Sequence, residues 1–235
     1  MTGGFFVAGT DTGVGKTEIA RALCTLLAPV RALKPVETGC EDLQKPADAL
    51  ALLAACGSGQ SLDDVCPYRF RLPAAPLVAA EAEGRVIDIE RILALSSERP
   101  IVVEPAGGLL VPLTRAPLSL EEIDPPDRAP AEVIVTNLDL AERLALPVVL
   151  VARAGLGTLN HCALSVAALE ARGLAVAAIV LNRVTPQDDP SVASNPRWVH
   201  ELTGALVLGP TPFVRDPASR PRALAPFVDS LVGRQ

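Results

Sequence analysis

Residues 9–17 of this chain read G-T-D-T-G-V-G-K-T and limit the folds that the rest can adopt. An apolar run, residues 5–8, precedes this stretch and an amphipathic run, residues 19–27, follows it, which predicts a strand, a glycine-rich turn and a helix. Such a turn directs successive backbone N–H groups into one concavity at the positive end of the helix, where a polyphosphate fits. Lys16 can reach β- and γ-phosphates, and the Thr17 hydroxyl suits Mg²⁺.

The match to the phosphate-loop pattern G-x-x-x-x-G-K-[ST] is imperfect. Thr10 stands at its first glycine position, and Gly9 comes one residue early. The alternative interpretation is an ordinary glycine-rich turn that opens a helix. The G-K-T sequence and its strand–helix context agree with each other and favour the phosphate loop.

The composition limits the partners and the compartment. The net charge is −6 and the chain has no long basic run, which argues against nucleic acid as the main partner. No apolar run reaches the ~18 residues of a membrane span, and the N-terminus lacks the charged start of a secretory signal. Five scattered cysteines without a C-x-x-C pair fit the reduced thiols of a cytoplasmic protein, and two histidines do not make a His-rich metal site. We therefore expect a cytoplasmic protein without membrane or nucleic-acid binding.

Short apolar runs alternate with helical patterns along the chain. The predicted strands are continuously apolar, which is typical of a parallel sheet buried on both faces. They span residues 5–9, 30–34, 101–104, 147–152, 176–181 and 206–208. The predicted helices span residues 16–27, 47–56, 77–84, 87–96, 137–144, 195–202 and 223–232, with another ending at Arg172. Residues 63–76 are predicted to be irregular, and residues 114–130, rich in Pro, Asp and Glu, to form a solvated loop.

The chain contains neither an internal repeat nor a linker. We therefore predict that residues 1–235 form a single α/β domain with a mainly parallel sheet, helices on both faces and a P-loop NTPase-like fold.

Three charged residues outside the loop are candidates for the same site. Lys34 ends a predicted strand and opens K-P-V-E-T-G, and the carboxyl ends of strands in an open α/β sheet face the ligand crevice. Asp48 either places a favourable charge at a helix N-terminus or points at a metal ion. Glu104 closes an apolar strand before A-G-G, as a metal-binding acid of P-loop enzymes does, although a turn carboxylate is the alternative. The alternative for Lys34 is a surface position, which is the ordinary position of a lone lysine.

A second glycine-containing turn, G-L-G-T-L-N-H at residues 155–161, joins a predicted strand to a predicted helix. It is a second candidate anion site.

Taken in order, these motifs make the chain resemble the dethiobiotin synthetase family over nearly its whole length. The pairing of G-T-D-T-x-V-G-K-T with K-P-V-x-[ST]-G is specific, whereas each motif alone is weaker. The resemblance implies a homodimeric, Mg²⁺-dependent ligase. It closes the cyclic urea of dethiobiotin from 7,8-diaminopelargonate, CO₂ and ATP through a carbamate and a carbamic–phosphoric anhydride.

The resemblance also implies a role for each matching residue. Lys16 and Lys34 would be catalytic, with Lys34 facing the carbamate and the γ-phosphate. The nucleotide would be held by Thr12, Gly13, Val14, Gly15, Lys16, Thr17, Glu18, Asp48, Glu104, Ala106 and Gly107, with Asn182 at the adenine. Mg²⁺ would be bound by Thr17, Asp48 and Glu104. The diamine would be bound by Thr12 and Thr38 and, from the other subunit, by Gly155, Leu156, Gly157, Thr158, Leu159 and Asn160.

Three residues depart from the family pattern. Gly13 replaces an acid found in some relatives, and Pro105 removes an N–H after the strand-end glutamate. Arg183 stands where an aspartate is common, which leaves the base selectivity open.

Three rival functions share the same loop. A partition-type ATPase is the main alternative, but its loop usually carries an early lysine, where this chain has Thr10 and Asp11. A cobyrinate-type amide synthase would need a glutamine-using domain for which the chain is too short. A catalytically dead binding module would not be expected to retain Lys16, Thr17 and Lys34 together with the strand-end glutamate.

Overall fold

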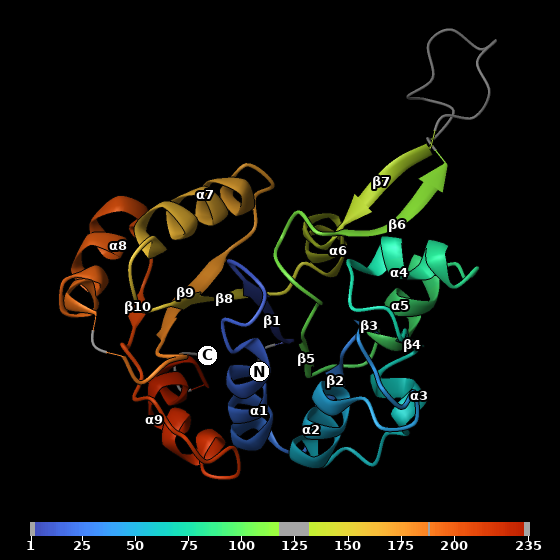
Figure 1. The fold of residues 1–235 in the computed structure, drawn as a ribbon, viewed down its shortest axis with the longest axis horizontal. Coiled ribbons are helices and arrows are strands. Elements are labelled where there is room, and N and C mark those ends of the chain that lie inside the picture. Colours follow the sequence, from blue (N-terminus) through green and yellow to red (C-terminus); the bar gives the residue numbers. More distant parts are fainter. Residues whose placement is uncertain (1–2, 118–131, 188, 233–235) are drawn as a thin grey trace, which may run out of the picture.

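The computed structural model describes residues 3–117, 132–187 and 189–232. Its centre is a six-stranded sheet in the order β10-β9-β8-β1-β5-β2, in which all neighbouring strands are parallel (Figure 1). The strands are β1 (Gly4–Gly9), β2 (Arg31–Leu33), β5 (Ile101–Val103), β8 (Val148–Arg153), β9 (Val176–Asn182) and β10 (Val207–Leu208). The predicted parallel sheet is therefore confirmed.

The sheet is buried on both faces because successive residues of each strand enter different cores. In β1, Phe5 and Val7 belong to one apolar cluster, whereas Phe6 and Ala8 belong to the other. Side chains alternate across a strand, so a strand that is covered on both faces has to be apolar throughout. This explains the continuous apolar runs in the sequence.

Helices form a layer on each face (Figure 1). The cluster around Phe5 contains residues of α1 (Lys16–Leu27), α2 (Ala47–Cys56), α3 (Leu62–Val65) and α9 (Arg220–Val232). The cluster around Phe6 contains residues of α4 (Pro76–Ala82), α5 (Ile89–Leu95), α6 (Asn137–Leu144), α7 (Thr158–Glu170) and α8 (Asn195–Thr203). A 3₁₀ turn, Pro190–Ala193, precedes α8. Each predicted helix is present, with ends shifted by a few residues.

Two predictions for irregular segments were wrong in part. Within residues 63–76, α3 ends and β4 (Tyr68–Arg69) forms, pairing in parallel with β3 (Val36–Glu37). Two-residue strands carry too little periodicity to be recognised in a sequence. Within residues 114–130, the first four belong to β6 (Pro112–Pro117), which pairs antiparallel with β7 (Glu132–Thr136). The rest of that predicted loop, residues 118–130, lies outside the described residues.

The topology gathers the candidate site residues at one edge of the sheet. The parallel strands β5, β1, β8 and β9 are neighbours, so their carboxyl ends lie side by side. Glu104 follows β5, the phosphate loop follows β1, and Asn182 ends β9. Ligands of open α/β sheets bind at this edge.

In the part of the chain that the structure describes, no helix has both the length and the apolar character needed to cross a membrane.

Candidate active site

The loop between β1 and α1 has the geometry of an anion-binding turn. Gly15 caps α1 with φ 90° and ψ 29°, and no side chain of the described residues caps the helix there. The first N–H groups of a helix have no intrahelical partner, so these groups are available to a ligand. A Cβ on Gly15 would lie 2.1 Å from Asn182 Nδ2, and the left-handed φ is itself unfavourable for other residues. Glycine is therefore required at this position.

Lys16 folds back over this loop. Its side chain is buried, and Nζ donates a hydrogen bond to the Asp11 carbonyl oxygen at 3.0 Å. Burial lowers the pKa of Lys16, against the opposing effect of the Glu104 carboxylate. An ammonium group held over the amide concavity of the loop is placed to meet the oxygens of a phosphate.

Lys34 is the centre of a buried charge cluster. Its Nζ lies 2.7 Å from Asp48 Oδ2 and 2.6 Å from Glu104 Oε1, and its side chain is 4% exposed. Burial alone would lower the pKa of Lys34, but the two carboxylates outweigh burial and raise it. Burial also raises the pKa of Glu104, whereas at Asp48 the ion pair with Lys34 overcomes burial and lowers the pKa. The surface interpretation of Lys34 is wrong, because this lysine is a fixed, charged group beside the phosphate loop.

The residues predicted to bind Mg²⁺ lie together at this cluster. The Thr17 hydroxyl donates to Glu104 Oε1 at 2.8 Å, and the same oxygen accepts from Lys34. Glu104 Oε2 is buried and accepts no hydrogen bond from the described residues. A buried carboxylate oxygen without a partner is costly, and it fits a cation bound beside it.

Thr17 and the two carboxylates supply only part of the ligands that a metal ion needs. Among the described residues, no group of three or more His, Cys, Asp or Glu side chains is arranged to hold a metal ion. Mg²⁺ usually keeps several waters and shares phosphate oxygens, so one hydroxyl and one or two carboxylates are the donor set that suits it.

Sequence reasoning missed a role for Glu37. This buried side chain accepts hydrogen bonds from the Asp48 and Ala49 N–H groups at 3.1 and 2.8 Å, so it caps the N-terminus of α2. Burial raises the pKa of Glu37, and these backbone hydrogen bonds oppose the effect. The cap fixes Asp48 opposite Lys34. The sequence signal for this role was the acid in K-P-V-E-T-G, which is Glu37. The role was missed because its partner, the Asp48 N–H, lies eleven residues further along the chain.

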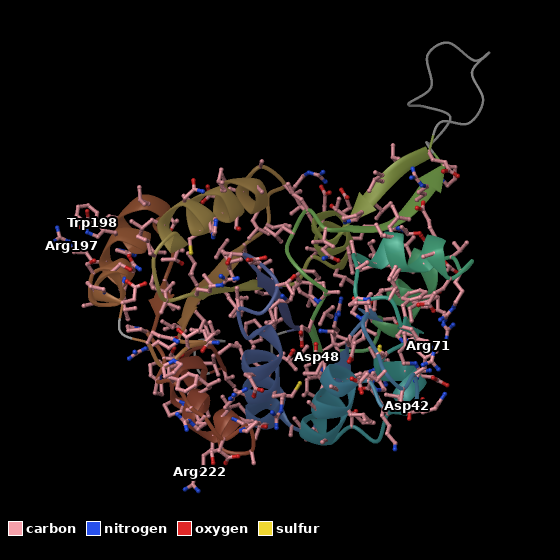
Figure 2. The ribbon with its side chains drawn as sticks, in the orientation of Figure 1. Asp42, Asp48, Arg71, Arg197, Trp198 and Arg222 are labelled. Atoms are coloured by element: carbon pink, nitrogen blue, oxygen red, sulfur yellow. The ribbon has the colours of Figure 1, made fainter. Side chains whose placement is uncertain are left out.

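A cleft of about 690 Å³ unites most of the predicted residues. Its lining includes Thr12, Gly13, Gly15, Lys16, Thr17, Glu18, Lys34, Thr38, Asp48, Glu104, Ala106 and Gly107. Asp48, in the first turn of α2, lies near the middle of the molecule (Figure 2). Val14 is fully buried behind the loop.

The segment after β5 is held from outside the cleft. Asn137 Nδ2 donates to the carbonyl oxygens of Ala106 and Gly108 at 2.7 and 2.8 Å. Pro105, which departs from the family pattern, is buried just before this segment. The Asn137 contacts hold the backbone on both sides of Gly107, just after Pro105.

Asn182 lines a second cavity of about 190 Å³, whose walls also include Val184, Phe213 and Leu224. Its side chain already has partners within the chain. Nδ2 donates to the Val14 carbonyl oxygen at 2.9 Å, and Oδ1 accepts from the Thr211 hydroxyl at 2.7 Å. Asn182 therefore braces the back of the phosphate loop, in addition to any contact with a base.

The second turn lies outside the main cleft. Gly155 and Leu156 line a third cavity of about 510 Å³ together with Thr12, Gly13 and Arg153. The Leu156 N–H donates to Asp189 Oδ2 at 2.7 Å, so one amide of the turn already binds a carboxylate of its own chain. Gly157 caps α7 with φ 90°, and no described side chain caps that helix. The remaining predicted residues of the turn, Thr158, Leu159 and Asn160, form the first turn of α7 and line none of these three cavities.

The chain is similar to known proteins over most of its length. A family model described as an AAA domain matches residues 3–121 and 128–219. The ATP-dependent dethiobiotin synthetase BioD of Anaeromyxobacter dehalogenans (strain 2CP-C) is 46% identical over 233 residues, covering 94% of this chain and 95% of that protein. BioD of Bacillus subtilis (strain 168) is 34% identical over 218 residues, covering 89% and 87%.

Among solved structures, a ParA family ATPase from Chlorobium tepidum TLS aligns with a TM-score of 0.52 over 97% of this chain and 92% of that chain. Its sequence identity is only 13%, so the likeness concerns the fold alone. Function is not fixed by the fold, so the family is judged from the sequence relatives. Their identity over nearly the full length shows that this chain belongs to the dethiobiotin synthetase family.

Proposed function

We propose that this protein is an ATP-dependent dethiobiotin synthetase. One observation carries the proposal beyond family membership. The buried Lys34 ammonium lies beside the phosphate loop and within 2.7 Å of both Asp48 and Glu104. This arrangement offers a fixed positive charge where a phosphoryl group would be transferred.

The reaction would proceed by three bond-forming steps. One amine of 7,8-diaminopelargonate adds to CO₂ and loses a proton, giving a carbamate. A carbamate oxygen attacks the γ-phosphorus of ATP and ADP leaves, which forms a carbamic–phosphoric anhydride. The second amine then attacks the carbonyl carbon, closes the cyclic urea and expels phosphate.

Such a reaction needs positioning and charge neutralisation more than a covalent nucleophile. Lys16 and the loop amides would hold the phosphates, and Lys34 would neutralise the charge that develops between the carbamate and the γ-phosphate. The carbamate is already anionic, so no strong protein base is required. Thr12 and Thr38 would hydrogen-bond near the diamine, and both line the main cleft.

We also propose that Thr17, Asp48 and Glu104 hold Mg²⁺. When bound, this ion would neutralise phosphate charge. The unpartnered Glu104 Oε2 supports this assignment. Asp48 and Glu104 are now held by Lys34, so the lysine would share them with the ion.

The remaining proposals concern the whole protein. Residues 1–235 would form one domain and act in the cytoplasm as a homodimer, and the five free cysteines support a reducing compartment. In the dimer, the turn at Gly155–Asn160 would hold the substrate carboxylate in the partner's site. Its absence from the lining of the main cleft of its own chain supports this arrangement.

The test is to measure phosphate release from ATP with Mg²⁺, with and without the diamine and bicarbonate, and to identify the product by mass spectrometry. We expect release to depend on both additions and to match dethiobiotin one to one. Phosphate release at the same rate with and without the diamine would contradict the proposal and favour a partition-type ATPase.

A further inference from the structure

The two cavities beside the phosphate loop meet at the first turn of α1. The main cleft and the smaller cavity share four lining residues, namely Gly13, Gly15, Glu18 and Arg220. A ligand that occupied both cavities would pass between the two glycines and the Glu18–Arg220 pair. A nucleoside triphosphate is such a ligand, with its phosphates at the loop and its base in the smaller cavity, against Val184, Phe213 and Leu224.

Arg220 joins the two cavities physically. It is the first residue of α9, and its Nε donates to the Val214 carbonyl oxygen at 2.9 Å. Its Nη2 donates to the Arg215 carbonyl oxygen at 3.4 Å, and its Nη1 lies 3.6 Å from Glu18 Oε1. One guanidinium group therefore contacts both the wall of the smaller cavity and the helix that begins at the phosphate loop.

An ordinary surface ion pair is the alternative account of Arg220. Exposed pairs contribute about 0–1 kcal/mol and organise little. Here Glu18 is 18% exposed and Arg220 33%, and Glu18 Oε2 also accepts from Arg21 Nη1 at 3.0 Å. The planar guanidinium reaches two carbonyl oxygens and a carboxylate from three separate nitrogens, an arrangement that the single nitrogen of a lysine does not reproduce.

We propose that Arg220 is a positioning residue for the nucleotide. It keeps residues 212–215 against the first turn of α1, so that the cavity for the base stays at a fixed distance from the phosphate loop. The inference rests on the proposed function only in requiring a nucleoside triphosphate at the loop. It predicts that Arg220 matters for the nucleoside part of the ligand and little for its phosphates.

Calorimetric binding of ATP and of inorganic tripolyphosphate, both with Mg²⁺, separates these parts. Tripolyphosphate probes the phosphate loop alone, whereas ATP probes both cavities. For Arg220→Ala we expect the Kd for ATP to rise about tenfold, or about 1.4 kcal/mol, and that for tripolyphosphate by less than about threefold. Arg220→Lys should give an intermediate loss for ATP, because an ammonium cannot replace the fork.

Arg222→Ala is the matched control. Arg222 lies on the same helix, is exposed and points away from the molecule (Figure 2), and its replacement removes the same charge. We expect this variant to bind both ligands as the wild type does. Thermal unfolding of each variant checks the fold, and if Arg220→Ala fails to fold, the selectivity of Arg220→Lys for ATP decides the question.

Two results would overturn the inference. Unchanged ATP binding in Arg220→Ala would show that the contacts organise nothing, and an equal loss for both ligands would show a general charge effect. Failure of the wild type to bind either ligand would instead contradict the nucleotide site, and with it the proposed function. Normal binding without diamine-dependent turnover would contradict the synthetase activity and leave the role of Arg220 intact.

Discussion

Glu37 sets the position of Asp48, which contacts Lys34. It binds the N–H groups that open α2, and Asp48 is itself one of the residues that donate. Carboxylates near helix N-termini are favoured by the unpaired N–H groups and by the helix dipole. The Asp48 carboxylate is thereby free to contact Lys34 at 2.7 Å. Glu37 therefore caps the helix, whereas Asp48 contacts Lys34 in the candidate site.

We expect Glu37→Gln to destabilise the protein and weaken its activity together. The amide presents only one oxygen, so one of the two buried N–H groups loses its acceptor at a cost of about 1–3 kcal/mol. For a chain of this size each kcal/mol corresponds to about 2–4 °C in Tm. Thermal unfolding measures the change, with Asp42→Asn as control, since Asp42 is exposed in the same connection (Figure 2). Equal Tm values for the two variants would remove the capping role.

Glu104→Gln and Asp48→Asn should each raise the Mg²⁺ concentration needed for half-maximal activity. A hard cation prefers anionic oxygen, so we expect a rise of roughly tenfold, or about 1.4 kcal/mol. Titration of activity against Mg²⁺ measures this, with Glu98→Gln as control, because Glu98 pairs with Arg31 at an exposed position. Titration curves that overlay the wild type would mean that both acids are structural.

At the scale of elements, the phosphate loop depends on contacts that come from β9. Asn182, at the end of β9, donates to the Val14 carbonyl oxygen and leaves no room for a side chain at Gly15. The G-K-T sequence predicted the loop and its helix correctly. It could not predict the contact between Asn182 and Val14. These residues are separated by 168 positions, and an asparagine alone carries no periodic signal.

Gly15→Ala tests this brace. The methyl group would lie 2.1 Å from Asn182 Nδ2 at a φ of 90°, so either the Asn182 brace or the loop must move. We expect ATP affinity to fall at least roughly tenfold, with a stability loss of about 1–3 kcal/mol. Gly84→Ala is the control, because Gly84 has φ 61° and no atom of the described residues within 4 Å of the added methyl. If both variants bound ATP as the wild type does, the brace would have no part in shaping the loop.

At the scale of the whole molecule, the sequence predicted the elements with a regular apolar pattern. It missed the very short strands and the contacts between segments that are far apart in the chain. Continuous apolar strands gave the six-stranded parallel sheet, and strand ends gave Lys34 and Glu104. The two-residue pair β3–β4 and the strands β6 and β7 were missed, because short or half-exposed strands resemble loops. The junction at Arg220 depends on α9 packing beside α1, a contact that no local pattern encodes.

The proposed shared site predicts complementation between subunits. Lys16→Ala impairs the phosphate loop, and Asn160→Ala alters the turn at α7, so a hybrid dimer would retain one site with both parts intact. Mixing the two inactive proteins should restore about a quarter of the wild-type rate if subunits exchange at random and each hybrid has one working site. Absence of recovery, with exchange demonstrated by mass spectrometry, would argue for a site within each chain.

Lys34 tests the central claim most directly. Its burial between two carboxylates suggests a charge that is preorganised for phosphoryl transfer rather than for ATP binding. Lys34→Arg should recover little activity, since a planar fork does not replace a compact ammonium. The decisive measurement is the rate of dethiobiotin formation by Lys34→Gln at saturating ATP, diamine and bicarbonate, alongside its Kd for ATP. We predict a rate lower by ~10²–10³ with a Kd changed only a few-fold. A wild-type saturated rate in this variant would contradict the account.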